Sequence, residues 1–364
     1  MGIPKITCVR VGYGHVAQIH ERKMQECGVK TVAIVEVDKQ KQLQAQGNGF
    51  TVFSSCLEAA KLNPTFWDIC VSTNQHFKLI QNILTIVPQA NIFVEKPVCL
   101  FSEIPAIRKL LLNFKGKITV NENYASSTIK DIMRKIALND LEINIQRVVV
   151  EFTKNRTLNF ASGRFIDDEL GALGYEGSHM VALVSEFLEE YVPYCMLETQ
   201  FNDFVFKASQ LRLDNQGSAY IHYKSTSGVG VELYTSMMGH VKYKYPLFFT
   251  EDIPVQDLDS KYRIIALYGS NCQKDDYCIV GFLEPIKCFN RCYGAVYVTK
   301  NSKIESIIAP ILDDTMLWHF KKTLRYFQGE AENPYPVEKG IKVVEILHSL
   351  SENKGRVHAT SESF

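Results

Sequence analysis

Short apolar runs alternate with helix-length segments through the first third of the chain. The runs are rich in β-branched, aromatic or other apolar residues and have the length of buried parallel strands. They cover Cys8–Val11, Thr31–Val35, Phe50–Phe53, Trp67–Ser72, Asn91–Val94 and Lys117–Val120. Helices are predicted between them, at Cys56–Leu62, Phe77–Ile86 and Ser102–Asn113 among others. This α/β alternation predicts a doubly wound parallel sheet.

The pattern changes after Tyr124. A predicted helix, Thr128–Leu138, gives way to long runs of β type rather than to further βαβ units. Examples are Arg147–Thr153, Ala219–Ser225, Val229–Thr235, Tyr262–Tyr268 and Tyr277–Phe282. Two predicted helices, Thr315–Phe327 and Val337–Leu350, close the chain. We therefore predict a Rossmann domain at residues 1–124 and an α+β domain with an open, largely antiparallel sheet at residues 125–364.

Two segments interrupt or end this pattern. Gly239–Lys261 is rich in aromatic residues, prolines and charges, and is interpreted as a surface excursion, with a lid or a dimer contact as alternatives. The polar tail after Asn353 is expected to fray.

The first predicted strand leads into a glycine motif. Gly12, Gly14 and Ala17 fit the spacing G-x-G-x-x-[GA], in which the first glycine permits a turn and the second lets a pyrophosphate approach the backbone. Free N–H groups at the following helix start favour a phosphate, and Glu36, at the end of the second strand, is placed to bind a ribose diol. The motif predicts a dinucleotide site, with a turn that holds no nucleotide as the alternative. The same turn brings in Tyr13, His15 and Val16 as cofactor-binding candidates.

Polar stretches follow three of the predicted strands. They are Ser72–His76, Glu95–Pro97 and Asn121–Tyr124. Ligands of a doubly wound sheet bind outside the carboxyl ends of its strands, so these stretches are expected to line one crevice. They supply the remaining cofactor-binding candidates, which are Thr73, Asn74, His76, Glu95, Lys96 and Asn123.

Composition excludes several classes of function. Forty basic residues balance forty acidic ones among 364, which gives no support to a nucleic-acid-binding surface. No apolar stretch approaches the roughly 20 residues of a membrane span, and no signal peptide is recognisable, so we expect a cytoplasmic protein. The late cysteines Cys272, Cys278, Cys288 and Cys292 form no CxxC pair, so no metal site is predicted.

Several motifs carry a resemblance to a known family. The segment GYGHVAQIH, which ends at His20, fits G-x-G-x-x-[GA]-x-x-H, and NIFVEKP ends in a Glu-Lys-Pro turn. Both resemble the glucose-fructose oxidoreductase/inositol dehydrogenase (Gfo/Idh/MocA) family, and VSTNQHF is loosely similar to that family's Thr-Pro-Asn-x-x-His loop. The resemblance covers about the first 125 residues well. It implies an NAD(P)-dependent oxidoreductase that forms a homodimer or homotetramer and binds a small, carbohydrate-like substrate.

The resemblance makes Lys96 a catalytic candidate. In the family this lysine contacts the substrate hydroxyl and the cofactor ribose, where its ammonium would stabilise charge developing on the substrate oxygen. Pro97 stiffens the turn and so aims the lysine. The alternative is a lysine that only pairs with Glu95.

The segment LGALGYEGSHMVALV resembles the family's G-G-x-x-x-D-x-G-x-H stretch, whose histidine is the usual acid/base. His179 matches that histidine, Tyr175 stands in the place of the aspartate, and Glu176 follows it. All three can share one helix face, so Glu176 or Tyr175 could orient the His179 ring. The alternative is a histidine that only packs in the helix.

A frequent family arginine after Tyr124 is replaced by Ala125. Tyr124 itself could border the nicotinamide. Possible replacements for the missing substrate anchor, or else solvated surface residues, are Arg156, Arg164, Asp167 and Asp168.

The leading hypothesis is therefore hydride transfer between a nicotinamide and a secondary alcohol or ketone carbon of a sugar, amino sugar or cyclitol. NAD is preferred because Glu36 would repel a 2′-phosphate, although Lys39 is a nearby cation and NADP is possible. The alternatives are a non-catalytic, dinucleotide-sensing regulator and a reductase of an imine or tetrapyrrole.

Overall fold

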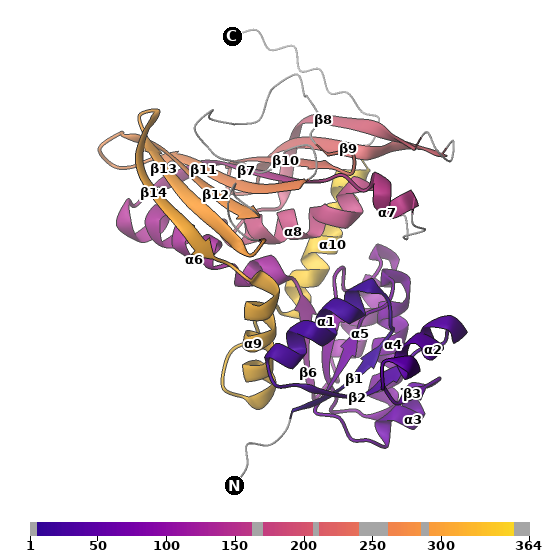
Figure 1. Cartoon of the computed structure of the whole chain (residues 1–364). Coiled ribbons are helices and arrows are strands. Elements are labelled where there is room, and N and C mark those ends of the chain that lie inside the picture. The colour runs from indigo at the N-terminus through magenta and orange to yellow at the C-terminus, as the bar shows by residue number, and fades with distance from the viewer. Residues whose placement is uncertain (1–5, 162–169, 207–210, 240–260, 285–290, 353–364) are drawn as a thin grey trace. The chain divides into compact units, whose positions relative to one another are not determined.

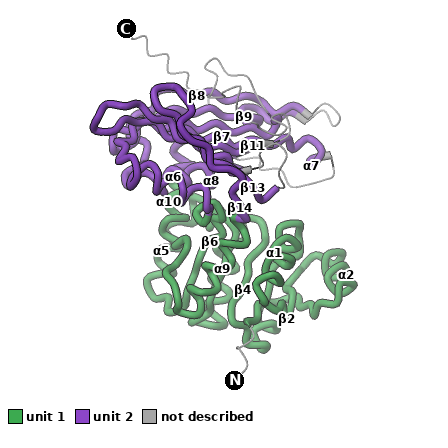
Figure 2. Tube along the Cα trace, turned by 60° about the vertical axis from the view of Figure 1, so that its left-hand side comes forward, with its two compact units in different colours: residues 1–126, 315–345 green, residues 127–314, 346–364 purple. Residues whose placement is uncertain are grey.

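The computed structural model describes residues 6–161, 170–206, 211–239, 261–284 and 291–352 (Figure 1). Two compact units divide the chain: residues 1–126 with 315–345, and residues 127–314 with 346–364 (Figure 2). The sequence places all of residues 125–364 in the second domain, whereas residues 315–345 pack with the first unit. Arg164, Asp167, Asp168, residues 240–260 and the tail from residue 353 lie outside the described residues.

The first unit is built on a parallel sheet, as the sequence predicts. Its described strands are β1 (Thr7–Val11), β2 (Lys30–Val35), β3 (Val52–Phe53), β4 (Phe66–Ile69), β5 (Asn91–Glu95) and β6 (Lys117–Asn121). They run in the order β3-β2-β1-β4-β5-β6, and every pair is parallel. The order reverses between β1 and β4, which is the switch point where a doubly wound sheet binds its ligand.

Helices connect these strands. They are α1 (His15–Glu26), α2 (Lys39–Gly47), α3 (Cys56–Ala60), α4 (His76–Ile86) and α5 (Ile104–Leu111). Helix α2 has no apolar stripe that the sequence could reveal, because Ala45 is its one buried residue. Its start is fixed instead by Asp38, whose side chain accepts hydrogen bonds from the N–H groups of Gln40 and Lys41 at 2.9 and 3.0 Å.

Helix α9 (Thr315–Gln328) covers the same face of the first sheet as α1. Its Phe320, Leu324 and Phe327 pack into one buried cluster with Cys8, Met24, Phe66 and Phe93. His319 fastens the helix further, because its Nδ1 lies 2.9 Å from Ser126 Oγ and its Nε2 lies 2.9 Å from the Val120 carbonyl oxygen. Burial lowers the pKa of His319 to about 4, so the ring is neutral.

The second unit contains an open, largely antiparallel sheet, which confirms the predicted fold class. Its described strands are β7 (Asn144–Lys154), β8 (Pro193–Phe206), β9 (Leu211–Ser225), β10 (Gly230–Ser236), β11 (Lys261–Ser270), β12 (Asp276–Glu284), β13 (Tyr293–Lys300) and β14 (Lys303–Leu312). Their order is β14-β13-β12-β11-β7-β10-β9-β8, and β7 with β10 is the one parallel pair among them.

One face of this second sheet is covered by α6 (Thr128–Arg134) and α8 (Ala172–Ser185). The fit against α6 is close, because a Cβ on Gly281 of β12 would lie 2.3 Å from Met133 Sδ. Helix α7 (Thr157–Ala161) also belongs to the second unit, and α10 (Val337–Ser351) has residues in both units. Within the described part of the chain, no helix combines the length and apolar character needed to cross a bilayer.

The neutral state of His319 predicts a pH dependence of stability. The unfolded chain protonates this histidine near pH 6.5, whereas the folded chain resists protonation until about pH 4, so stability falls as the pH drops between these values. Between pH 7 and pH 5 this loss amounts to about 2 kcal/mol. His319→Gln should remove it from urea unfolding curves, and His348→Gln on α10 should not. An unchanged pH slope in His319→Gln would contradict the prediction.

Candidate functional site

The turn from β1 into α1 has the geometry that the glycine motif predicts. Gly12 has φ +94°, and a Cβ there would lie 2.7 Å from the Cys70 carbonyl oxygen, so the position requires glycine. A Cβ on Gly14 would meet nothing within 4 Å, so the backbone there is open to an approaching group. No side chain caps the start of α1 at His15, and the first N–H groups of a helix favour a phosphate.

Glu36 directly follows β2. Its carboxylate accepts hydrogen bonds from the backbone N–H groups of Tyr13, Val37 and Asp38 at 2.8, 2.8 and 2.9 Å. These bonds fix the carboxylate at the rim of a cavity of about 740 Å³. The Tyr13 side chain turns away, because its hydroxyl accepts a hydrogen bond from Asn48 Nδ2 at 2.9 Å and its ring packs on Phe50.

The cavity suits the adenosine half of a dinucleotide. Its size falls in the range of ligand pockets, and its wall includes both Gly12 and Glu36. It also includes Ser54, Ser55, Leu57 and Lys78, which the sequence did not single out. Ser54 and Ser55 directly follow β3, and polar residues at the carboxyl end of a strand are candidates for ligand binding. This signal was weak in the sequence because β3 is only two residues long.

The other predicted cofactor contacts take different positions. Thr73 and Asn74 lie in a short 3-10 helix, Thr73–Gln75, where Ser72 Oγ donates to Asn74 Oδ1 at 2.8 Å. Asn123 Nδ2 donates to Thr315 Oγ1 at 2.6 Å.

His76, predicted to touch the cofactor, is buried. Its Nδ1 lies 2.7 Å from the Pro97 carbonyl oxygen and its Nε2 lies 3.1 Å from that of Val71. Both ring nitrogens therefore face backbone carbonyls, and burial lowers the pKa of His76. This side chain fastens the Glu95–Pro97 turn to the end of β4, and its contact with the cofactor stays a prediction.

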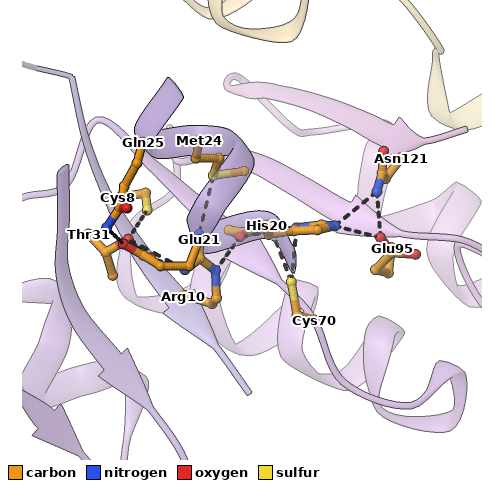
Figure 3. A network of polar contacts seen from close by, with 11 residues as sticks. Cys8, Arg10, His20, Glu21, Met24, Gln25, Thr31, Cys70, Glu95 and Asn121 are labelled. Carbon is orange, nitrogen blue, oxygen red and sulfur yellow. Dashed lines mark hydrogen bonds and ion pairs between the residues drawn. The ribbon is translucent and has the colours of Figure 1, made fainter. Parts of the chain in front are cut away.

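A network of buried charges lies behind the turn, between the first sheet and α1 (Figure 3). Arg10 on β1 is completely buried, and its Nε donates to Asp68 Oδ2 on β4 at 2.7 Å. Its Nη1 donates to Glu21 on α1, which also accepts from the Thr31 hydroxyl at 2.5 Å. These residues were not predicted from the sequence, although the charges inside the apolar runs CVRV and FWDIC were a visible signal.

His20 extends the network across the sheet. Its Nδ1 lies 3.0 Å from Asp68 Oδ1 and its Nε2 lies 2.8 Å from Glu95 Oε1. Asn121 Nδ2 donates to the same Glu95 oxygen, and Cys70 Sγ lies 3.2 Å from His20 Nδ1. Strands β4, β5 and β6 are thus joined to α1 through one imidazole.

The pKa shifts in this network follow from burial and pairing. Burial alone would lower the pKa of His20, but the Asp68 carboxylate at 3.0 Å outweighs it and raises the pKa well above 6.5. Burial alone would raise the pKa values of Asp68 and Glu95, but His20 outweighs it in both, with Arg10 on Asp68 and Asn121 on Glu95, and both pKa values are lowered. Burial raises the pKa of the Cys70 thiol to about 12, so the thiol stays protonated.

His20, Asp68 and Cys70 are the one group of possible metal ligands among the residues described. Their atoms are already hydrogen-bonded to one another at 3.0 to 3.3 Å, and the Arg10 guanidinium is bonded to the same Asp68 carboxylate. A second cation is disfavoured there. Of the late cysteines, Cys278 is buried with its pKa raised to about 12 by burial, and Cys288 lies outside the described residues.

In the second unit, His179 and Glu176 lie on α8. His179 is 9% exposed, with its ring 6.3 Å from that of Phe152 on β7. The two Glu176 carboxylate oxygens accept from Arg156 Nη2 at 2.6 Å and from Arg263 Nη2 at 2.7 Å. Glu176 thus ties α8 to the end of β7 and to β11.

Tyr175 and Arg156 belong to the same cluster. The Arg156 guanidinium lies 4.2 Å above the Tyr175 ring. Arg156 is 6% exposed, so it is not the solvated surface residue that the sequence allowed as one interpretation.

Comparison with known proteins agrees with this geometry. Residues 6–117 match the model of the GFO_IDH_MocA family, which is described as an oxidoreductase family with an NAD-binding Rossmann fold. No curated protein matches the sequence significantly.

Solved structures share the fold over nearly the whole chain. An oxidoreductase from Agrobacterium radiobacter in complex with NAD+, L-tartaric acid and magnesium has a TM-score of 0.72 at 15% identity, covering 97% of each chain. A UDP-N-acetylglucosamine 3-dehydrogenase from Acidithiobacillus ferrooxidans has a TM-score of 0.67 at 11% identity, covering 95% of this chain and 97% of that one. Apo scyllo-inositol dehydrogenase from Lactobacillus casei has a TM-score of 0.66 at 13% identity, covering 96% and 95%.

The fold and the site define an NAD-binding oxidoreductase. Residues 6–117 match the model of the Gfo/Idh/MocA oxidoreductase family, which confirms the predicted resemblance and NAD as the predicted cofactor.

The two motif glycines should respond differently to substitution. Gly14→Ala adds a Cβ only where the pyrophosphate would approach, so we expect at least about tenfold weaker NAD binding by calorimetry, with an unfolding free energy within about 0.5 kcal/mol of wild type. Gly12→Ala must strain the backbone, which costs about 1–3 kcal/mol of stability. Gly47→Ala, in open space on α2, is the control. Wild-type NAD affinity in Gly14→Ala would contradict this arrangement.

Proposed function

We propose that the protein is an NAD-dependent dehydrogenase or reductase acting on a secondary alcohol or ketone carbon of a sugar, amino sugar or cyclitol. The observation that carries the proposal is the Glu95–Lys96–Pro97 turn, which directly follows β5 and is bonded to His76 and His20. The names of two structural neighbours, a UDP-N-acetylglucosamine 3-dehydrogenase and a scyllo-inositol dehydrogenase, support the substrate class.

NAD, when bound, supplies a nicotinamide ring that accepts or returns a hydride. In the proposed reaction His179 takes the proton of the substrate hydroxyl and returns it in the reverse direction. The Lys96 ammonium stabilises the negative charge that develops on the substrate oxygen. The Glu95 carboxylate is bonded to His20, to Asn121 and to the Lys96 backbone N–H at 3.3 Å, and the Lys96 charge contributes to lowering the Glu95 pKa.

A second candidate function is a regulator that binds the dinucleotide without turnover. Two observations favour it. Glu176 is already bonded to two arginines, which tie it to β11 and to the end of β7. Ala125 stands where family members frequently have an arginine that anchors the substrate. A panel of sugars, amino sugars and cyclitols, assayed by absorbance of the reduced nicotinamide, separates the candidates. Turnover of any member removes the regulator, whereas saturable NAD binding with no turnover across the panel favours it.

We predict tighter binding of NAD than of NADP. A 2′-phosphate would meet the Glu36 carboxylate at the cavity rim, and like charges repel strongly where water is scarce. Glu36→Gln should reduce the preference, whereas Glu26→Gln on the exposed side of α1 should not change it. Calorimetric titration with both dinucleotides tests this. Tighter binding of NADP by about tenfold, or 1.4 kcal/mol, would contradict it.

The proposed roles of His179 and Lys96 predict a loss of turnover greater than any loss of NAD affinity. His179→Ala should lower kcat by about 10²–10⁴-fold, the usual contribution of a general acid/base. Lys96→Ala should also lower kcat, with some weakening of NAD binding if the lysine contacts the ribose. Steady-state kinetics with the substrate found in the panel measure both effects, and Lys322→Ala on α9 is a lysine control. Near-wild-type kcat in His179→Ala would return that residue to a packing role.

A further inference from the structure

We propose that His20 is a positioning residue for Lys96, acting as a permanently protonated bridge between Asp68 and Glu95. The proposal rests on the proposed function in one respect, namely that Lys96 takes part in the reaction. The contacts that carry it lie wholly within the first unit.

The first step concerns the protonation state of His20. Both ring nitrogens face carboxylate oxygens, at 3.0 Å on Asp68 and 2.8 Å on Glu95. Asn121 Nδ2 also lies 3.0 Å from His20 Nε2, but it donates to Glu95 Oε1 as well. The pKa values of Asp68 and Glu95 are lowered, so both are carboxylates, which only accept hydrogen bonds. With an ionised acceptor at each nitrogen, both nitrogens donate and the ring is an imidazolium. The residue is 0% exposed, which leaves no water to replace either partner.

The second step concerns the charge around the ring. Arg10 and His20 are the cations of the network, and Glu21, Asp68 and Glu95 are its anions. Each cation contacts two of the carboxylates. Loss of the His20 charge would therefore leave the negative charges of Asp68 and Glu95 buried with too few cations to balance them, which is energetically unfavourable. Phe93 and Phe320 pack around the ring at 5.7 and 4.9 Å and keep the site apolar.

The third step connects His20 to Lys96. Glu95 is the last residue of β5, and its Oε1 accepts from His20 Nε2 while its Oε2 lies 3.3 Å from the Lys96 backbone nitrogen. The carboxylate therefore points back into the core and holds the backbone of the next residue. On the far side of the turn, His76 contacts the Pro97 carbonyl oxygen at 2.7 Å. Two buried histidines thus hold the backbone that carries Lys96.

A purely structural role for His20 makes a different prediction from a positioning role. In the structural case, removing the imidazolium loosens the whole unit evenly. In the positioning case, the loss is concentrated on the turn, because the Lys96 N–H loses the fixed carboxylate to which it is bonded. Backbone hydrogen exchange measures local opening of this kind, needs no substrate, and is independent of turnover.

The experiment compares hydrogen exchange in wild type, His20→Gln and the surface control His348→Gln. We expect His20→Gln to speed exchange in residues 95–99 by at least about tenfold, with β2 residues 31–35 unchanged. With a known substrate, kcat should fall by about tenfold or more while the NAD dissociation constant stays within about threefold. Glu95→Gln tests the same contact from the other side and should give the same local signature if His20→Gln does not fold.

Unchanged exchange at residues 95–99 in a folded variant, or equal acceleration at residues 31–35, overturns the proposal. The two hypotheses can fail separately. Absence of turnover with every substrate leaves the exchange result to decide the role of His20, and an unaffected turn in an active enzyme removes the role of His20 while leaving the proposed reaction intact.

Discussion

The contact on which the first unit depends most is the buried bridge from Asp68 through His20 to Glu95. It joins α1 to β4 and β5 at 3.0 and 2.8 Å, and Arg10 extends it through Asp68 to β1. A buried ion network seldom contributes more stability than apolar packing of the same volume. The main effect of this network is to fix positions. Its charged groups cannot reach water, so they must keep their protein partners and few other arrangements are possible. The end of β5 is therefore fixed just where Lys96 begins.

The same unit places the cofactor elements by simpler means. Gly12 must be glycine because of its positive φ and the nearby Cys70 carbonyl, and Gly14 leaves the start of α1 open. Glu36 is held by three backbone N–H groups at the cavity rim. The second unit offers a separate cluster in which Glu176 binds two arginines beside the helix turn that carries His179. Each unit thus contributes one proposed reacting group on a well-supported element.

Features that depend on local sequence were predictable. Short stretches of sequence are enough to recognise the glycine turn, Glu36 after β2 and the alternation of strands and helices. The structure confirms the two sheets that this alternation predicts. Features that depend on distant partners were not. Arg10 and Asp68 are 58 residues apart, and Glu176 meets Arg263 across 87 residues. The contact of His76 with the Pro97 carbonyl oxygen was not predictable for the same reason, since the two residues are 21 positions apart. Helix α2 was not predicted because it has only one buried residue and therefore no apolar periodicity. Helix α9 was predicted to lie in the second domain, because an apolar helix face does not identify the sheet against which it packs.

The protonation state of His20 tests the central claim most directly, because every step from the buried network to the Lys96 turn requires an imidazolium. Nitrogen NMR of protein labelled at histidine reports whether each ring nitrogen carries a proton as the pH is raised. The account predicts that both nitrogens of His20 remain protonated well above pH 6.5. Loss of a proton from His20 at or below pH 6.5 in the folded protein would contradict it.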